Sequence, residues 1–388
     1  MAHLPDKSRT PSTTGGTGNA SRQEQSEAGQ NTAPPVCQET LALATDIMQK
    51  RFFLLDTSIP GIDTLLELAS KELANKFALG EDTPARYAIS PEPTEEELCP
   101  KPPSKAAMLA AGAKIGTLPT IFYSLLDAVN NRYASSADIA TVIAKDPALS
   151  AKLLRLINSP FYGLRHPVDD ITRAVTIVGN GPLVMLTMGT VLVSSFKKVP
   201  NSLLDMRSFW LHCIATGIFA RILANRMNQA NPEHFFITGL LHDIGRLIMF
   251  VTPPPCALHL IMDSHRRRIP MHVLEKDLLG FSHESLAADL LKSWNCPPVI
   301  IESILHHHEP LDSKITIANA ILPVANTLST AMGYGSSGSF LVPVADQFAL
   351  ELVGITPSTL PVIISEAHQV IQSTSNAMLT PDGGDQPS

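Results

Sequence analysis

Histidines and one aspartate are the residues of this chain whose types could hold a metal ion. His242 and Asp243 are adjacent within an apolar run, and a triple histidine, His306 to His308, comes later. Two further histidines, His212 and His283, stand singly in the sequence between Met206 and Trp294. Neutral imidazole and carboxylate together suit a divalent first-row metal. An aspartate in an apolar run also needs a partner, because an unpaired buried charge is costly.

These residues can meet only if several helices bring them together. Adjacent residues on a helix point about 100° apart, so His242 and Asp243 need help from other helices to face one ion. A metal held between helices, as in bundle sites, would supply it. That ion could lower the pKa of a bound water and so provide hydroxide for attack on phosphorus. The alternative is that the single histidines are satisfied core or surface groups, and that His306 to His308 merely suit a helix C-terminus.

Sequence signals for helix starts and helix ends are frequent in the part of the chain that must position these residues. Ser135 and Asp138 have capping-box spacing, which predicts a helix through Lys145. Asp146 then caps a helix that has proline at its first position and ends in the turn 158–160. Asp169 is expected to cap the next helix, which stops at Gly179; further helices are expected at 182–196, 206–227, 232–250, 284–294, 298–308 and 315–332. Sustained strand-like alternation is missing from the sequence, and β-rich segments such as 340–344 are short, so the expected fold class is all-α.

Composition divides the chain into segments. Residues 1–38 are rich in Ser, Thr, Gly, Pro and Gln and are expected to be a disordered tail. The remaining segments are expected to be an N-terminal helical segment at 39–80 with a break at Pro60-Gly61, a Pro-rich linker at 81–105 containing the acidic run 95–97, a main domain at 106–335, a C-terminal helical extension at 336–375 and a disordered tail at 376–388. The helical segment 40–77 could pack on the core or bind a partner.

Charge and cysteine content restrict the environment. The 29 Lys and Arg are outnumbered by 36 Asp and Glu, which argues against broad nucleic-acid binding. Five widely spaced cysteines without a CxxC pair indicate neither a disulfide framework nor a structural zinc site, so a cytoplasmic location is expected. The start lacks a signal-peptide core, and the longest apolar stretch, 183–196, is too short to span a bilayer, so no membrane association is expected.

Several motifs, in a consistent order, resemble HD-related output domains (HDOD) of the HD-domain superfamily over about residues 114–330. The motifs are Asp146 to Gly163, which contains Asn-Ser-Pro-Phe-Tyr-Gly; Ile171 to Gly179; Phe209-Trp210-Leu211-His212; His242-Asp243-Ile244-Gly245-Arg246; Gly280 to Glu284; and Ile304 to Pro310 with its three histidines. The resemblance implies an HD-domain-like helical bundle preceded by a helical subdomain. It also implies a role in bacterial signal transduction, often without catalysis.

The resemblance further implies a set of metal ligands. His212, His242 and Asp243 fall on the first three ligand positions of the HD site. His283, His307 and His308 match positions that hold a second metal in the related HD-GYP phosphodiesterases. The ion would be Fe, Mn, Mg, Zn or Ni. At the last position Asn326 stands where Asp is expected, and Pro310 to Asp312 replace Gly-Tyr-Pro, so hydrolysis of cyclic di-GMP is not expected.

Two functions are compatible with these features. The first is a signalling module that acts through contacts with a kinase, a cyclase, a response regulator or a second copy of the chain, and Asn326 and the missing Gly-Tyr-Pro favour it. The second is a metal-dependent phosphohydrolase or phosphodiesterase acting on a nucleotide or cyclic nucleotide, with Asp243 in the catalytic role. Arg246 could then hold phosphate, although a surface position is the expected one. Asn-Ser-Pro-Phe-Tyr-Gly, Trp210 and Trp294 are expected to have packing roles.

Overall fold

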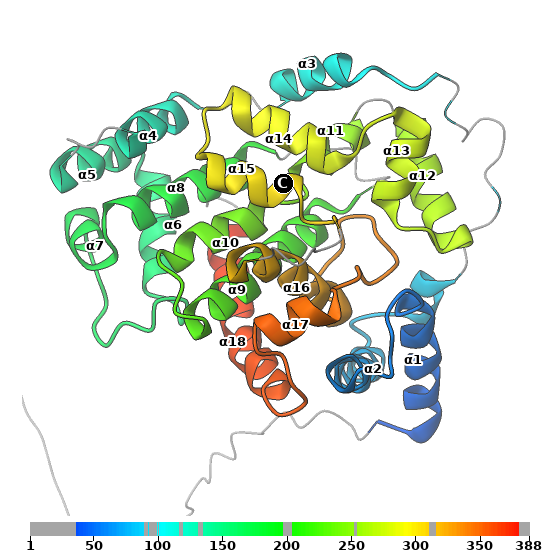
Figure 1. Cartoon of the computed structure of the whole chain (residues 1–388). Coiled ribbons are helices and arrows are strands. Elements are labelled where there is room, and N and C mark those ends of the chain that lie inside the picture. Colours follow the sequence, from blue (N-terminus) through cyan, green and yellow to red (C-terminus); the bar gives the residue numbers. More distant parts are fainter. Residues whose placement is uncertain are drawn as a thin grey trace, which may run out of the picture.

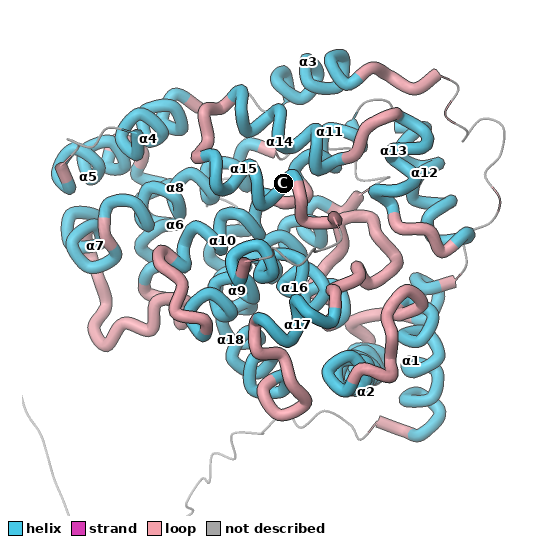
Figure 2. Tube along the Cα trace, viewed as in Figure 1, coloured by secondary structure: helices cyan, strands magenta, loops and turns pink. Residues whose placement is uncertain are grey.

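The protein is built from helices alone within the residues that its structure describes, which confirms the all-α prediction (Figures 1 and 2). The computed structural model describes residues 36–88, 92, 99, 101–115, 119–130, 135–196, 204–251, 254–309 and 316–379. The helices are α1 (Gln38–Arg51), α2 (Pro60–Leu79), η1 (Pro84–Tyr87), α3 (Lys105–Ile115), α4 (Thr120–Asn130), α5 (Ser136–Ala144), α6 (Pro147–Ile157), α7 (Ile171–Val178), α8 (Asn180–Ser195), α9 (Met206–Arg226), α10 (Pro232–Leu241), α11 (Ile244–Val251), α12 (Pro254–Arg267), α13 (Met271–Leu279), α14 (His283–Ser293), α15 (Pro298–Leu305), α16 (Ile317–Ala331), α17 (Gln347–Leu352) and α18 (Leu360–Leu379).

Helix α9 runs through the centre of the fold and packs against α10, α16 and α18 (Figure 1). Its contact with α10 is unusually close, because two glycines meet there. A Cβ built on Gly239 would lie 2.6 Å from the Gly217 Cα, which no side chain tolerates. The predicted apolar helix 182–196 is the core helix α8, with most of its side chains buried. The helices around α9 therefore pack close enough to place side chains of several of them in one small volume.

Several helix starts follow from local capping. The capping box of Ser135 and Asp138 is present, and the Asp146 carboxylate accepts a hydrogen bond from the Leu149 backbone N–H, as predicted. Two starts differ by one or two residues. Asp170 rather than Asp169 caps α7, and α8 begins at Asn180 rather than at Pro182.

One expected helix is wrong in a way that matters for the site. The apolar run 232–250 predicts a continuous helix, yet the structure divides it into α10 and α11, which are separated by His242 and Asp243. Gly245 packs at the start of α11, where a Cβ would lie 2.1 Å from the His283 carbonyl oxygen. The break frees His242 and Asp243 from the helical angle of about 100°, so both can face the same point.

The N-terminal hairpin of α1 and α2 packs against the main domain (Figure 1). The buried Arg51 guanidinium donates to the carbonyl oxygens of Thr330, at 2.9 Å, and Phe340, at 3.1 Å. Lys76 donates to the carbonyls of Met332 and Gly333, at the C-terminal end of α16. Both cations therefore satisfy carbonyls in the last turn of α16 or directly after it, where the helix dipole also favours positive charge.

The cysteine prediction needs a correction. A disulfide joins Cys99 and Cys256, which are 157 residues apart. Spacing along the chain gave no sign of this pair, because only the fold brings α12 next to the segment at residue 99. Cys37, Cys213 and Cys296 are free.

The helix expected at 298–308 ends at Leu305, and the tail expected to be disordered from residue 376 is helical as far as Leu379. The packing expectations agree with the structure. Phe161 of the Asn-Ser-Pro-Phe-Tyr-Gly turn packs edge-to-face on Phe236 at 4.9 Å, and Trp210 and Trp294 are buried. Within the described ranges no single helix is long and apolar enough to cross a membrane, although two bent helix pairs meet that test jointly. The expectations for 1–35, 95–97, 310–312 and 380–388 lie outside the described residues.

Candidate metal centre

Six of the seven predicted site residues meet in the core of the bundle. Two overlapping groups, His212 with His242 and Asp243, and Asp243 with His283, His307 and His308, each hold their potential ligand atoms within 4.8 Å of one another. Asp243 belongs to both groups. Its Oδ2 lies 3.2 Å from His242 Nε2 and 3.6 Å from His212 Nε2, and its Oδ1 lies 3.1 Å from His283 Nε2. Each carboxylate oxygen thus faces one group.

The Nε2 atoms of all five histidines converge on this point without a hydrogen-bond partner among the described residues. His212, His242, His283 and His307 are at most 3% exposed, so solvent does not replace those partners. Buried polar atoms are normally satisfied, and a convergent set of unsatisfied imidazole nitrogens is the donor set of a metal site. The residues present therefore fit a divalent metal.

The opposite ring nitrogens are anchored. His242 Nδ1 donates to the Gly239 carbonyl at 2.7 Å and His307 Nδ1 to the Ile304 carbonyl at 2.6 Å. His283 Nδ1 donates to Glu275 Oε2 at 2.6 Å. A hydrogen bond at Nδ1 fixes the tautomer that leaves the Nε2 lone pair free, which is the usual arrangement around metal-bound histidine.

The position of Arg246 differs from the expected one. Its side chain was expected at the surface, but the residue is 3% exposed. Its Nη1 lies 3.0 Å from Asp243 Oδ2, and its Nε lies 3.8 Å from Glu275 Oε1. The break between α10 and α11 turns this residue inward. Arg246 therefore supplies positive charge at the same carboxylate oxygen that faces His212 and His242.

Charge and burial shift the pKa values in opposite directions across the cluster. Burial raises the pKa of Asp243, but Arg246 and His242 outweigh it and hold that pKa well below the usual range. Burial lowers the pKa of His283, but Glu275 and Glu284 outweigh it and raise the value to about 9. Burial lowers the pKa of His307 to about 3, with help from His242 and His283. The cluster thus combines the Asp243 carboxylate, the neutral His307 imidazole and the His283 imidazole, whose positive form is stabilised by two carboxylates.

Asn326 is the one predicted site residue that these groups do not include. It is buried on α16, and its Oδ1 accepts a hydrogen bond from Thr330 at 3.3 Å. Ser329, on the same helix, lies 3.3 Å from His212 Nδ1, so α16 borders the cluster. The third histidine of the triple, His306, is half exposed and pairs with Glu302 and Glu309 instead.

Three neighbouring residues were not predicted. Glu275 and Glu284 form a third potential ligand group with His283. The His272 ring stacks on His308, with centroids 4.4 Å apart and an 11° angle. His272, His308 and Arg246 line a cavity of about 210 Å³ whose other walls are mostly apolar, such as Leu54 and Val342. Glu284 directly follows His283 in the sequence, which is a signal for it, whereas Glu275 and His272 have no sequence signal.

A histidine–aspartate pair that meets further histidines between the helices of an all-α bundle defines an HD-type domain. The comparison with family models agrees with this class, since the HDOD domain model matches residues 115–310. The chain belongs to the HDOD domain family.

Similar proteins come from several bacteria. An uncharacterized protein of Treponema pallidum (strain Nichols) is 30% identical over 215 residues, which cover 53% of this chain and 41% of that protein, so the match spans less than half of that relative. A Shewanella amazonensis protein provisionally named a phosphohydrolase has a TM-score of 0.57 at 24% identity, covering 70% of this chain and 98% of that one. An HDOD domain protein of unknown function from Geobacter sulfurreducens has a TM-score of 0.55 at 21% identity, covering 71% and 99%. At identities below 25%, these two structural matches establish the shared fold alone.

Proposed function

We propose that the chain is a bacterial signal-transduction output module that acts through protein contacts, on an HD scaffold whose metal centre is structural or sensory. The observation that carries this proposal is the burial of five of the six residues of the centre. His242, Asp243 and His283 are 0% exposed, and His212 and His307 are 2% and 3% exposed. Catalytic metal sites keep an open position for substrate, whereas structural sites are closed by protein ligands.

The charge of the centre supports the same assignment. Asn326 offers an uncharged amide where the family resemblance leads one to expect a carboxylate. Arg246 also places a guanidinium on Asp243 Oδ2. Both features reduce the negative charge available to a metal and its bound water. When bound, a divalent ion would supply Lewis acidity and link α9, α10 and α14 through His212, His242, Asp243 and His283.

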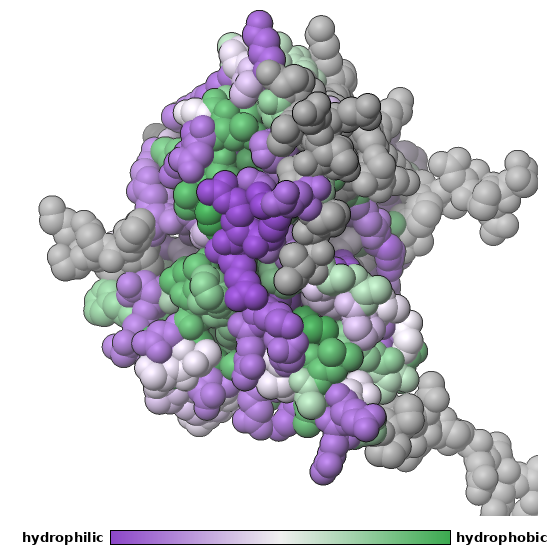
Figure 3. All heavy atoms as spheres, turned by 90° about the vertical axis from the view of Figure 1, so that its right-hand side faces the viewer, coloured by the Kyte–Doolittle hydropathy of each residue, from purple (hydrophilic) through white to green (hydrophobic). Residues whose placement is uncertain are grey.

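The surface leaves room for partner contacts. Figure 3 shows the face that carries α1, α12 and α13, where hydrophilic side chains form a band between smaller hydrophobic areas. Exposed apolar side chains include Phe53 on the α1–α2 connection at 57% and Val344 at 55%. A mixed surface of this kind suits a non-obligate interface. The proposed partners are a kinase, a cyclase, a response regulator or a second copy of the chain. A cytoplasmic location stays part of the proposal, although the Cys99–Cys256 disulfide removes the cysteine argument for it.

A second function has one observation in its favour. The cavity lined by Arg246, His272 and His308 reaches the second ligand group, so a small phosphate ester could approach there. The chain would then be a metal-dependent phosphohydrolase, in which Asp243 and the histidines hold the ion and Arg246 binds phosphate.

Metal content and turnover, measured on the same preparation, separate the two functions. For the output module we expect stoichiometric divalent metal, lost in Asp243→Ala, and no phosphate release from nucleotides, cyclic nucleotides or a generic phosphomonoester. Metal-dependent release that Asp243→Ala abolishes would establish the enzyme instead. A protein that binds no metal when refolded with Fe, Mn, Mg, Zn or Ni would contradict both assignments of the centre.

A further inference from the structure

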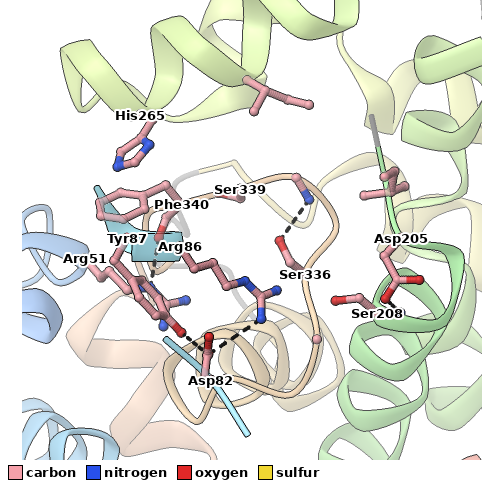
Figure 4. A pocket seen from close by; sticks show the side chains of 15 residues that line it. Arg51, Asp82, Arg86, Tyr87, Asp205, Ser208, His265, Ser336, Ser339 and Phe340 are labelled. Carbon is pink, nitrogen blue, oxygen red and sulfur yellow. Dashed lines mark hydrogen bonds and ion pairs between the residues drawn. The ribbon is translucent and has the colours of Figure 1, made fainter. Parts of the chain in front are cut away.

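A second cavity lies between the N-terminal hairpin and the main domain, outside the candidate metal centre (Figure 4). It measures about 260 Å³, and its walls come from the C-terminal end of α1, η1, the start of α9, α12 and the loop 333–340. That volume lies just below the usual range for drug-sized ligands, which is about 300–1,000 Å³. The cavity therefore suits one compact ligand.

The Gly/Ser loop, residues 333–340, forms a preformed wall of this cavity. Gly335 and Gly338 have φ values of +68° and +97°, which favour glycine. A Cβ on Gly335 would lie 2.0 Å from the Ser208 carbonyl oxygen, and one on Gly338 would lie 2.9 Å from the Phe250 ring. The Ser336 backbone N–H also donates to the Ser208 carbonyl at 3.2 Å. Close packing of this kind holds Gly335 and Gly338 in place before any ligand binds.

Arg86, on η1, supplies positive charge to the cavity. The Arg86 side chain is 54% exposed and extends toward Ser336 (Figure 4). Its nearest carboxylate oxygen, on Asp82, lies 3.6 Å away and accepts a hydrogen bond from the Tyr87 hydroxyl at 2.7 Å. That distance exceeds a normal hydrogen bond, so the Arg86 guanidinium keeps donors for a phosphate.

Acceptor and aromatic groups complete the lining. Asp205 stands across the cavity from Arg86 (Figure 4). Its carboxylate accepts from the backbone N–H groups of Arg207 and Ser208, and two oxygens have lone pairs for further donors. Tyr87 and Phe340 supply aromatic surface, and His265 stacks on Phe340 with centroids 3.9 Å apart.

We propose that this cavity binds a purine nucleoside monophosphate or a ligand of that chemistry, with its phosphate at Arg86, its ring against the aromatic wall and its N–H donors toward Asp205. A phosphate alone would use the donors of Arg86 but not the remaining lone pairs of the Asp205 carboxylate, and a neutral nucleoside would use those lone pairs but not the donors of Arg86.

The Gly/Ser loop also connects this cavity to the metal centre. Ser337 lies between two lining residues, and its Oγ accepts a hydrogen bond from Arg246 Nη1 at 2.7 Å. The same Nη1 contacts Asp243 Oδ2. A ligand that shifts Ser337 would shift Arg246 at the metal-facing oxygen, so ligand and metal affinities should be coupled, and coupling is reciprocal. This second step rests on the proposed metal centre, whereas the binding step does not.

The binding step is tested by calorimetric titration of the full chain with 5′-GMP, 5′-AMP, guanosine and inorganic phosphate. Both nucleotides should bind more tightly than guanosine or inorganic phosphate. GMP should bind more tightly than AMP, because guanine presents two adjacent N–H donors to Asp205. Arg86→Gln should weaken GMP binding about tenfold or more and leave guanosine binding unchanged. Arg155→Gln, which removes the same charge from an exposed position on α6, should change neither.

Saturation-transfer NMR on the purine protons gives a second readout for weak binding. Absence of saturable binding of GMP at millimolar concentration, or equal GMP affinity in the wild type and Arg86→Gln, overturns the site. For the coupling step, saturating GMP should change metal affinity in the wild type and not in Ser337→Ala, which keeps the cavity. An unchanged metal affinity in the wild type, beside normal GMP binding, would overturn the coupling alone.

Discussion

At the scale of single residues, the sequence indicated which side chains could bind a metal but not how they are supported. His242 and Asp243 stand out because an ionisable pair in an apolar run must be accounted for. Glu275 and Arg246 are ordinary helix residues by sequence, and only burial shows that they hold His283 and Asp243. His272 reaches His308 because α13 packs beside that turn, which no local pattern encodes.

Glu275 is the residue whose role can be tested most directly. Its carboxylate is 0% exposed and accepts from both the backbone N–H and Nδ1 of His283, at 2.8 and 2.6 Å. Glu275→Gln keeps the size of the side chain but weakens its hydrogen bonds to the His283 imidazole, so metal affinity should fall about 10- to 100-fold. Competition with a chromophoric chelator measures it. Glu309→Gln alters an exposed glutamate that also bonds a histidine, and an equal loss there would refute the assignment.

A substitution at Asn326 is expected to raise metal affinity rather than lower it. If α16 presents this position to the ion, Asn326→Asp should strengthen metal binding by about tenfold or more, because a carboxylate replaces an amide. If the side chain faces elsewhere, the new buried charge would be unpaired and the protein would lose stability without gaining affinity. Metal titration and urea unfolding of the same variant distinguish the two results.

At the scale of elements, helix starts were predictable because capping is local. Ser135 with Asp138, and Asp146 before proline, act within one turn of the chain. The break between α10 and α11 was not predictable, since the run 232–250 is apolar throughout and periodicity alone reads it as one helix. The docking of neighbouring helices on α10 and α11 decides that geometry, through contacts that are distant in sequence.

The glycine contact between α9 and α10 should be essential to this geometry. Gly239→Ala would place a methyl group about 2.6 Å from Gly217, so the two helices must separate. We expect a loss of about 1–3 kcal/mol in the free energy of unfolding together with weaker metal binding, because His212 lies on α9 and His242 directly follows α10. Gly181→Ala has open space around the new methyl group and should be neutral in both assays. Equal effects of the two substitutions would argue against the helix contact.

Arg51 joins the N-terminal hairpin to the end of α16. Arg51→Ala leaves the buried carbonyls of Thr330 and Phe340 without their donor, which should cost about 2 kcal/mol. Lys50→Ala removes only an exposed pair with Asp46 and should cost about 1 kcal/mol or less. Urea unfolding of both variants measures the difference, and equal losses would show that the buried contacts are not what holds the hairpin.

At the scale of the whole molecule, the class of fold followed from patterns along the chain, while its long-range contacts did not. The docking of α1 and α2, the Cys99–Cys256 disulfide and the Gly/Ser loop beside Arg246 each join segments far apart in sequence. The metal centre is the largest such junction, because its residues come from α9, from the α10–α11 break, from α14 and from the turn after α15.

Metal removal should therefore act on the molecule as a whole. An ion that binds only the folded chain stabilises it by about 2.7 kcal/mol when its free concentration is 100 times the Kd. Treatment with a chelator should lower the thermal unfolding midpoint, and readdition of the ion should restore it. Asp243→Asn removes the carboxylate charge common to both ligand groups, so its midpoint should be insensitive to either treatment. A wild-type midpoint that does not change with chelator or added metal would show that the five histidine Nε2 atoms do not bind an ion that contributes to folding.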